Sequence, residues 1–253
     1  MTPFLIQIKP FFAGFALAGI FIASAQANQV ALQNATASYS QTNPSLPGLW
    51  DPYKTIDGAA SGAFTSWAIY RDNGIQAESI VWETQSDLTL NGSQALRFEL
   101  SQQDYIPSPG HNLGRFRLSY TTVDRSQFAD GLANAGDVSA NWVLITPGSV
   151  NSSGGETMTL LPDSSVLVSG SLSAYPTYTV MATLGVSGIT GFRMEALKDE
   201  SLPFGGPGRE NTAGNFHLSE FSVAVVPEPS TIPLLLAGLG ILVVRRRSPA
   251  RAP

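Results

Sequence analysis

Short runs in which apolar and polar residues alternate, separated by turns, constrain this chain more than any other feature. Leu96, Phe98 and Leu100, for example, alternate with Arg97 and Glu99. A period of two places the apolar set on one face of a β-strand and the polar set on the other. Similar short runs recur at 79–83, 114–120, 141–146, 165–168, 178–183, 191–197 and 217–225. Many short strands, each with one apolar face, predict an all-β fold, an antiparallel β-sandwich.

Helical periodicity is nearly lacking, and only residues 124–135 are predicted to hold a short helix. Trp67 and Trp142 are expected in the core, because a large aromatic ring in a β domain is usually buried. Charged side chains on the polar strand faces, such as Arg117 and Glu195, could form a ligand platform or cross-strand ion pairs. We favour the ion pairs on a solvated sheet face, which are common and individually weak.

Composition narrows the classes of function. The chain has 253 residues, a net charge of −5, only 13% charged residues and no cysteine. Without cysteine there is no thiolate catalysis, no cysteine-ligated zinc and no iron–sulfur cluster. The acidic balance speaks against a nucleic-acid partner. The middle of the chain, 28–226, is long enough for one domain with a sizeable core.

The C-terminal stretch has three parts in strict order. Pro227, Glu228 and Pro229 form an open motif, because proline disfavours regular pairing. An apolar segment at 231–244 follows, short for a bilayer, and a basic tail at 245–253 completes the order. This order resembles the PEP-CTERM sorting signal. The resemblance implies a transmembrane helix at 231–244 and processing by a membrane enzyme of the exosortase type; the alternative is a buried C-terminal helix.

The N-terminal stretch, 1–27, has the features of a secretory signal peptide. A single lysine precedes an apolar segment that is expected to form the signal helix, and a small-x-small site ends at Ala27. Cleavage between Ala27 and Asn28 is therefore expected, the alternative being an uncleaved anchor. Together the two ends predict an exported protein, anchored through its C-terminal helix and then released to the cell surface or extracellular matrix.

Several segments of the middle together resemble the galactose-binding-like domain of the discoidin and coagulation factor type C group. They are the run 34–40, the run Lys54-Thr-Ile-Asp-Gly58 followed by Trp67, and the run 218–223. The resemblance implies a jelly-roll-like β-sandwich over 28–226. It also implies a structural Ca²⁺ held by Asp57 and Glu220, although Ala59 stands where the family often has a second acid.

Calcium needs six to eight oxygen ligands, which a turn at Asp57 could supply through carboxylate and carbonyl groups. Glu220 interrupts an apolar terminal strand, and such a carboxylate needs a partner. The alternative is that Asp57 makes a turn hydrogen bond while Glu220 points to solvent. Both interpretations stay open on the sequence.

Aromatic residues in loops indicate a carbohydrate site. Trp50 and Tyr53 lie in a proline-bounded loop, and Arg71 follows in the next one. Rings on rim loops stack on sugar faces, and a guanidinium can bond hydroxyl groups. The alternative is that these rings pack in the core.

Catalytic patterns are not found. His111 and His217 belong to no metal-binding motif and are expected at the surface or in turns, and the glycine-rich run 205–209 is expected to form a long turn. We therefore expect no enzyme, but an exported, surface-directed protein associated with extracellular polysaccharide or biofilm matrix. The alternatives are a carbohydrate-active enzyme with an unrecognised site and a purely structural surface protein.

Overall fold

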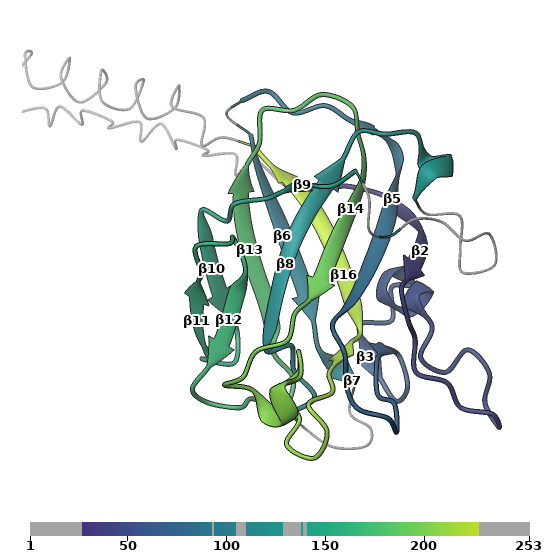
Figure 1. Ribbon diagram of the computed structural model, residues 1–253. Helices are drawn as coiled ribbons and strands as arrows, with labels where there is room; N and C mark the ends of the chain where they lie inside the picture. Colours follow the sequence, from purple (N-terminus) through teal and green to yellow (C-terminus); the bar gives the residue numbers. More distant parts are fainter. Residues whose placement is uncertain (1–26, 93, 105–109, 129–137, 139–140, 228–253) are drawn as a thin grey trace, which may run out of the picture. The chain divides into compact units, whose positions relative to one another are not determined.

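Figure 1 shows the computed structural model of the chain, which describes residues 27–92, 94–104, 110–128, 138 and 141–227. Two compact units are distinguished, Gln26–Glu228 on the one hand and Met1–Ala25 with Pro229–Pro253 on the other. All described residues belong to the first unit. Among them, no helix has the length and apolar character needed to cross a bilayer. The expected signal helix and the expected transmembrane helix at 231–244 lie outside the described residues.

The first sheet has five strands in the order β1-β16-β6-β13-β10 (Figure 1). Their bounds are β1 Asn28–Gln29, β16 Glu220–Val226, β6 Ala95–Ser101, β13 Thr177–Thr183 and β10 Ser149–Ser152. All neighbours in this sheet are antiparallel. β6, predicted from its alternation, lies in the middle of the sheet, where its apolar face can be fully covered.

The second sheet has the strand order β11-β12-β8-β14-β5-β2, and β9 also pairs with β8. Its strands are β11 Thr157–Leu160, β12 Val166–Ser169, β8 Arg115–Thr121, β14 Ile189–Ala196, β5 Glu78–Leu88, β2 Leu32–Ala37 and β9 Val143–Leu144. Every pairing is antiparallel. The order β1-β16-β6-β13 in one sheet and β12-β8-β14-β5 in the other is that of a jelly roll. The all-β sandwich is confirmed.

Aromatic pairs join the two sheets across the core. Trp82 of β5 stacks on Phe221 of β16, with ring centroids 3.8 Å apart and an interplanar angle of 9°. Phe98 of β6 meets Phe192 of β14 edge to face at 5.4 Å. Each of these rings belongs to the inward set of its strand, and all four are at most 1% exposed. The period-two pattern therefore places large side chains where the sheets face each other.

The structure differs from the sequence prediction at two segments. Of the expected strand at 141–146, only Val143–Leu144 pairs, and both side chains are about half exposed. Trp142 is half-buried and packs against Phe128 at 5.3 Å in a small separate apolar cluster, so its expected place in the main core is wrong. In 124–135, the described part forms the short 3-10 helix η2, Arg125–Gln127.

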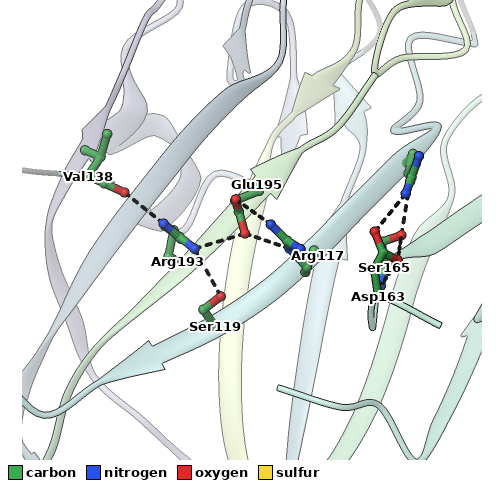
Figure 2. A network of polar contacts seen from close by, with 8 residues as sticks. Arg117, Ser119, Val138, Asp163, Ser165, Arg193 and Glu195 are labelled. Carbon is green, nitrogen blue, oxygen red and sulfur yellow. Dashed lines mark hydrogen bonds and ion pairs between the residues drawn. The ribbon is translucent and has the colours of Figure 1, made fainter. Parts of the chain in front are cut away.

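The polar face of the second sheet carries the expected cross-strand ion pairs (Figure 2). Arg117 of β8 donates two hydrogen bonds to Glu195 of β14, at 2.8 and 2.9 Å, and the two residues are direct partners in the register. Arg193 donates to the same carboxylate at 3.0 Å. Arg193 is only 7% exposed, however, and its guanidinium lies 5.3 Å from the Trp142 ring. This face is therefore partly covered rather than fully solvated.

Candidate functional site

The loops at one end of the sandwich hold the candidate site. Asn28 pairs with Val225, so the chain enters and leaves the sandwich at the same end. The opposite end is formed by the loops that precede β5 and β8 and by the long loop that follows β14 (Figure 1). This loop end also carries short pairings of β4 (Trp67–Ala68) with β15 (His217–Leu218) and of β3 (Ser61–Gly62) with β7 (Gln103–Asp104).

A pocket of about 220 Å³ opens at this end, and we call it the histidine pocket. Residues that line it include Gln41, Trp50, Tyr70, His111, Asn215 and His217. They come from loops and from the short strand β15, which lie far apart in the sequence and which the two sheets bring together. Tyr70 is 40% exposed, whereas Trp50 is 5% exposed.

Three rings form a row beside the histidine pocket. Trp50 lies 4.7 Å from His217, and His217 lies 4.3 Å from His111, as measured between ring centroids. On its other side, Trp50 meets Phe64 edge to face at 5.4 Å. Trp50 therefore forms a packed wall of the pocket, and it is not the freely exposed ring expected from its loop.

His217 is buried, which corrects the expectation of a surface or turn histidine. Its side chain is 3% exposed, and its Nδ1 lies 3.6 Å from Oδ2 of Asp104. Burial lowers the pKa of His217, although the neighbouring Asp104 carboxylate opposes this shift. The imidazole is therefore held neutral at physiological pH. His111, which is half-buried, faces the same pocket.

Two side chains offer polar groups to the histidine pocket. The buried Oε1 of Gln41 has no hydrogen-bond partner among the described residues. Asn215 accepts a hydrogen bond from the backbone N–H of Ile69 at 3.2 Å through Oδ1. That bond uses Oδ1 and leaves the Nδ2 donors of the amide for other partners. Gln41 and Asn215 both line the pocket, so it has amide groups in its wall beside the rings.

A buried carboxylate shapes the rim of the pocket. Glu210 is 6% exposed and accepts hydrogen bonds from the backbone N–H groups of Thr212, at 2.6 Å, and Ala213, at 2.8 Å. Burial alone would raise the pKa of Glu210, but the hydrogen bond from the Thr212 hydroxyl, followed by the two backbone bonds and the nearby His111, outweighs it and lowers the pKa. The carboxylate therefore stays ionised and holds the turn at 210–213 in one conformation.

The glycine-rich run 205–209, expected to form a long turn, instead follows the end of a 3-10 helix and makes an isolated β-bridge between Gly208 and Leu113. It packs against the 214–215 segment. A Cβ on Gly208 would lie 1.9 Å from the carbonyl oxygen of Asn215, and Gly208 donates its N–H to the carbonyl of Gly214 at 2.9 Å. Only glycine permits this backbone approach. The close packing fixes Asn215 beside the pocket and Phe204 just before the run.

A second pocket, of about 370 Å³, lies next to the histidine pocket, and we call it the neighbouring pocket. Its lining includes Tyr70, Arg71, Asp72, Lys198, Phe204 and Thr212. Tyr70, Thr212 and Ala213 line both pockets. The two hollows are therefore contiguous, with these residues between them.

The structure brings together two of the three carbohydrate-binding candidates. Trp50 lines the histidine pocket and Arg71 lines the neighbouring pocket. Arg71 is held by an ion pair with Glu78 and by the Tyr39 ring, which lies 3.6 Å from its guanidinium carbon. Tyr53, on the 3-10 helix η1 (Pro52–Ile56), is 49% exposed but lines neither pocket.

Asp57 and Glu220, the calcium candidates, lie next to each other. Glu220 accepts a hydrogen bond from the N–H of Gly58 at 3.2 Å, and Asp57 accepts one from Ala59 at 2.9 Å. Burial, followed by the charge of Asp57, raises the pKa of Glu220 to about 7. Asp57 therefore makes the turn bond of the alternative interpretation, whereas Glu220 is half-buried rather than pointing freely to solvent.

A calcium ion at this pair would need more oxygen ligands than the two carboxylates supply. Two adjacent carboxylates that repel each other suit a cation between them, which would favour the charged form of both. The described residues contain no group of three or more acidic, histidine or cysteine side chains around a common point. Backbone carbonyls and water would therefore supply the remaining ligands. The pair supplies two carboxylates, so a calcium ion at Asp57 and Glu220 stays a prediction.

Most pocket residues were missed by sequence reasoning, although one signal was available. His217 has the same parity as Phe221 and Val223, whose side chains lie in the core, so the alternation already placed it on the inward face. Gln41, Asn215 and Glu210 lie in loops, where no period applies. Their convergence depends on long-range strand pairing.

Comparison with known proteins identifies the C-terminal segment. Residues 225–248 match the family described as the PEP-CTERM protein-sorting motif. The chain carries a PEP-CTERM signal. Such a signal implies export and association with the cell surface. Pro227 is the last described residue, so Glu228 and Pro229 of the PEP-CTERM motif lie outside the described residues, as does the whole region before Ala27.

Solved structures similar to the chain are galactose-binding-like domains. The family 32 carbohydrate-binding module of Clostridium perfringens NanJ, solved with galactose, is 10% identical with a TM-score of 0.41, covering 79% of this chain and 99% of that one. The Streptococcus pneumoniae beta-galactosidase BgaA is 9% identical with a TM-score of 0.46, covering 79% and 92%. The comparison with curated proteins gives no match.

Proposed function

We propose that this chain is an exported, surface-directed protein that binds carbohydrate without catalysis, at the histidine pocket, and so associates with extracellular polysaccharide or biofilm matrix. The PEP-CTERM signal supports export, and processing by an exosortase-type enzyme is part of the proposal. The pocket geometry supports carbohydrate as the ligand. In this proposal Trp50 forms a wall of the binding site, while Arg71, which lines the neighbouring pocket, is kept as a candidate contact. Tyr53 is also kept as a candidate, and the experiments below separate it from the pocket residues.

The observation that carries the proposal is the meeting of ring surface and polar groups without protein partners. A sugar presents a C–H face to an aromatic ring and hydroxyl groups to donors and acceptors at its edge. Tyr70 supplies exposed ring surface, while Gln41 Oε1 and Asn215 Nδ2 supply an acceptor and donors. A hydroxyl group can satisfy both, since it donates and accepts.

The position of the pocket supports the same function. Both connections of the sandwich leave at the end marked by the Asn28–Val225 pair, and the pocket lies at the other end. The residues at which the chain enters and leaves the sandwich therefore lie away from the pocket. This arrangement suits the capture of a polymer outside the cell.

A glycan array with the purified full-length protein tests the proposal. We expect binding to a defined set of glycans, and Gln41→Leu, which removes the acceptor with little change of shape, should weaken it by about tenfold. Gln29→Leu at the opposite end is the matched control and should bind as the wild type does. Absence of binding to any glycan, or equal loss in both variants, would contradict the proposal.

Glycan hydrolysis is a second candidate, supported by one observation. A glycosidase needs a carboxyl group with a raised pKa beside a second carboxylate. Glu220 next to Asp57 has this character, although neither residue lines the histidine pocket or the neighbouring pocket. Release of reducing ends from bound polysaccharide, abolished by Glu220→Gln, would favour hydrolysis over simple binding.

A further inference from the structure

The histidine pocket and the neighbouring pocket form one extended surface. Resting on the proposed function, we propose that this surface binds a glycan chain of at least two sugar units, one unit in each pocket, with Phe204 as a stacking platform at the far end. Small-ligand pockets usually have volumes of about 300–1,000 Å³. The histidine pocket alone, at about 220 Å³, lies below that range, and the neighbouring pocket adds about 370 Å³.

Hydrogen bonds hold the residues between the two pockets in place. Thr212 and Ala213 are fixed by the buried Glu210 carboxylate, which also accepts the Thr212 hydroxyl at 2.6 Å. Tyr70, on the other side, donates its hydroxyl to Asp72 at 3.2 Å. A ligand that fills both pockets therefore crosses residues that are already ordered, and binding costs little conformational entropy there.

Phe204 provides the strongest sign of a ligand at the neighbouring pocket. Its side chain is 67% exposed, although it is large and apolar. Its backbone has φ 56 and ψ 19, a left-handed conformation that is costly for a bulky residue. The 3-10 helix η4, Pro203–Gly205, is closed by hydrogen bonds from Gly205 to Leu202 and from Gly206 to Pro203, both 3.0 Å. The fold thus holds an exposed ring in a strained position at the pocket rim.

The neighbouring pocket also has a free cationic donor. Each arginine of the described ranges contacts a carboxylate or, for Arg209, two backbone carbonyls. Lys54 lies over the Tyr53 ring. Within those same ranges, Lys198 is the one cationic side chain without an ion pair, side-chain hydrogen bond or ring contact, and it lines this pocket. Its ammonium group can donate to sugar hydroxyl groups next to the Phe204 ring.

Titration calorimetry with ladders of one to six sugar units tests this inference on the full-length protein. The probes are β-1,4-linked galactose, β-1,4-linked glucose and β-1,6-linked N-acetylglucosamine oligomers. For the ladder that binds, we expect affinity to rise roughly three- to tenfold from the monosaccharide to the trisaccharide, the gain of an added ring contact. Phe204→Ala should remove this gain and leave monosaccharide affinity unchanged.

Leu160→Ala, which removes another exposed apolar side chain on the distant strand β11, is the matched control and should keep the full gain. Thermal melts establish that each variant is folded. Equal affinity for all chain lengths, or an equal loss at every length in Phe204→Ala, would overturn the extended site while leaving the proposed function intact. If no oligomer of any ladder binds, the proposed function fails together with this inference.

Discussion

Two glutamates at the loop end show how differently the same side chain behaves in two settings. Glu210 is almost fully buried, yet its pKa is lowered; Glu220 is only half-buried, yet burial and then the charge of Asp57 raise its pKa to about 7. Glu210 accepts from two backbone N–H groups and a hydroxyl, whereas Glu220 accepts from one backbone N–H.

The difference shows that several local donors together can outweigh the effect of burial on the pKa of a carboxyl group. We call Glu210 an internal strut, because its ionised carboxylate holds the turn at 210–213 through hydrogen bonds that the protein itself donates. The carboxylate of Glu220 lacks such a set of donors, and the charge that acts on its pKa, that of Asp57, has the same sign. The first is suited to shaping a pocket, and the second is suited to receiving a cation.

The largest expected effect comes from removing the strut. Glu210→Ala should lower the free energy of unfolding by about 3 kcal/mol, since it leaves buried backbone N–H groups without their charged acceptor. Urea denaturation measures this loss. Glu99→Ala, at a glutamate that is 37% exposed and paired with Arg97, should cost less than about 1 kcal/mol. Similar losses in the two variants would remove the distinction between a buried strut and a surface ion pair.

The next effect concerns calcium at Glu220. At pH 8, saturating calcium should raise the unfolding free energy by about 2 kcal/mol, because it binds the native site and not the unfolded chain. Glu220→Gln should lose this response and keep the calcium-free stability of the wild type or exceed it. Melting curves with calcium and with a chelator make the comparison. A wild-type melt that ignores calcium would discard the metal site.

The pH dependence of Glu220 should be smaller and opposite to the usual behaviour of an acid. Between its ordinary value of 4.5 and its folded pKa of about 7, the native state holds a proton that the unfolded chain has released. Stability without calcium should therefore fall as the pH rises through this range, by about 1 kcal/mol after allowance for solvent screening. Glu220→Gln should flatten the profile. A rise in wild-type stability that the variant shares would contradict the assignment.

His217 should act on the acid side of the same profile. Burial lowers its pKa, so the native imidazole stays neutral while the unfolded one gains a proton below about 6.5. Stability, present above that pH, should be lost as the pH falls through it. Asp104, His111 and Glu210 face this group, so His217→Gln is compared with the wild type by melts at pH 7.5 and 5.5. An unchanged slope in the variant would assign the loss to those neighbours.

The smallest expected effect is at Tyr53. This residue lines neither pocket, so Tyr53→Ala should leave glycan affinity unchanged and alter stability by less than about 0.5 kcal/mol. Titration calorimetry measures the affinity and scanning calorimetry the stability, each compared with Gln41→Leu. A clear loss of affinity in Tyr53→Ala would restore the site that the sequence placed around the 3-10 helix η1.

What the sequence predicted well was local. β6 and β14 follow from a period of two, because alternation assigns each side chain to a face without reference to the rest of the chain. Trp142 lies in a run without such alternation. The run therefore did not indicate whether the Trp142 side chain packs in the main core or, as in the structure, against Phe128 in the small separate cluster. The candidate pair of Asp57 and Glu220 came from a family pattern, and the structure places these residues together.

The pockets were not predictable in this way. Gln41, His111 and Asn215 lie in separate loops, and they meet only because strand pairing closes the sandwich above them. Phe204 lies in no alternating run, and its left-handed backbone conformation cannot be read from the sequence. Trp50 was recognised as important by its type, but its burial depended on neighbours such as Phe64 that no local rule brings to it.

The pairing of β1 with β16 has a consequence for how the molecule would work when tethered. A load applied through either terminus enters at one pole and pulls on adjacent strands of a single sheet. Tension on a polymer captured at the loop end would pass through those loops and along the strands to the terminal pair. The load would then be shared by the backbone hydrogen bonds between β1 and β16.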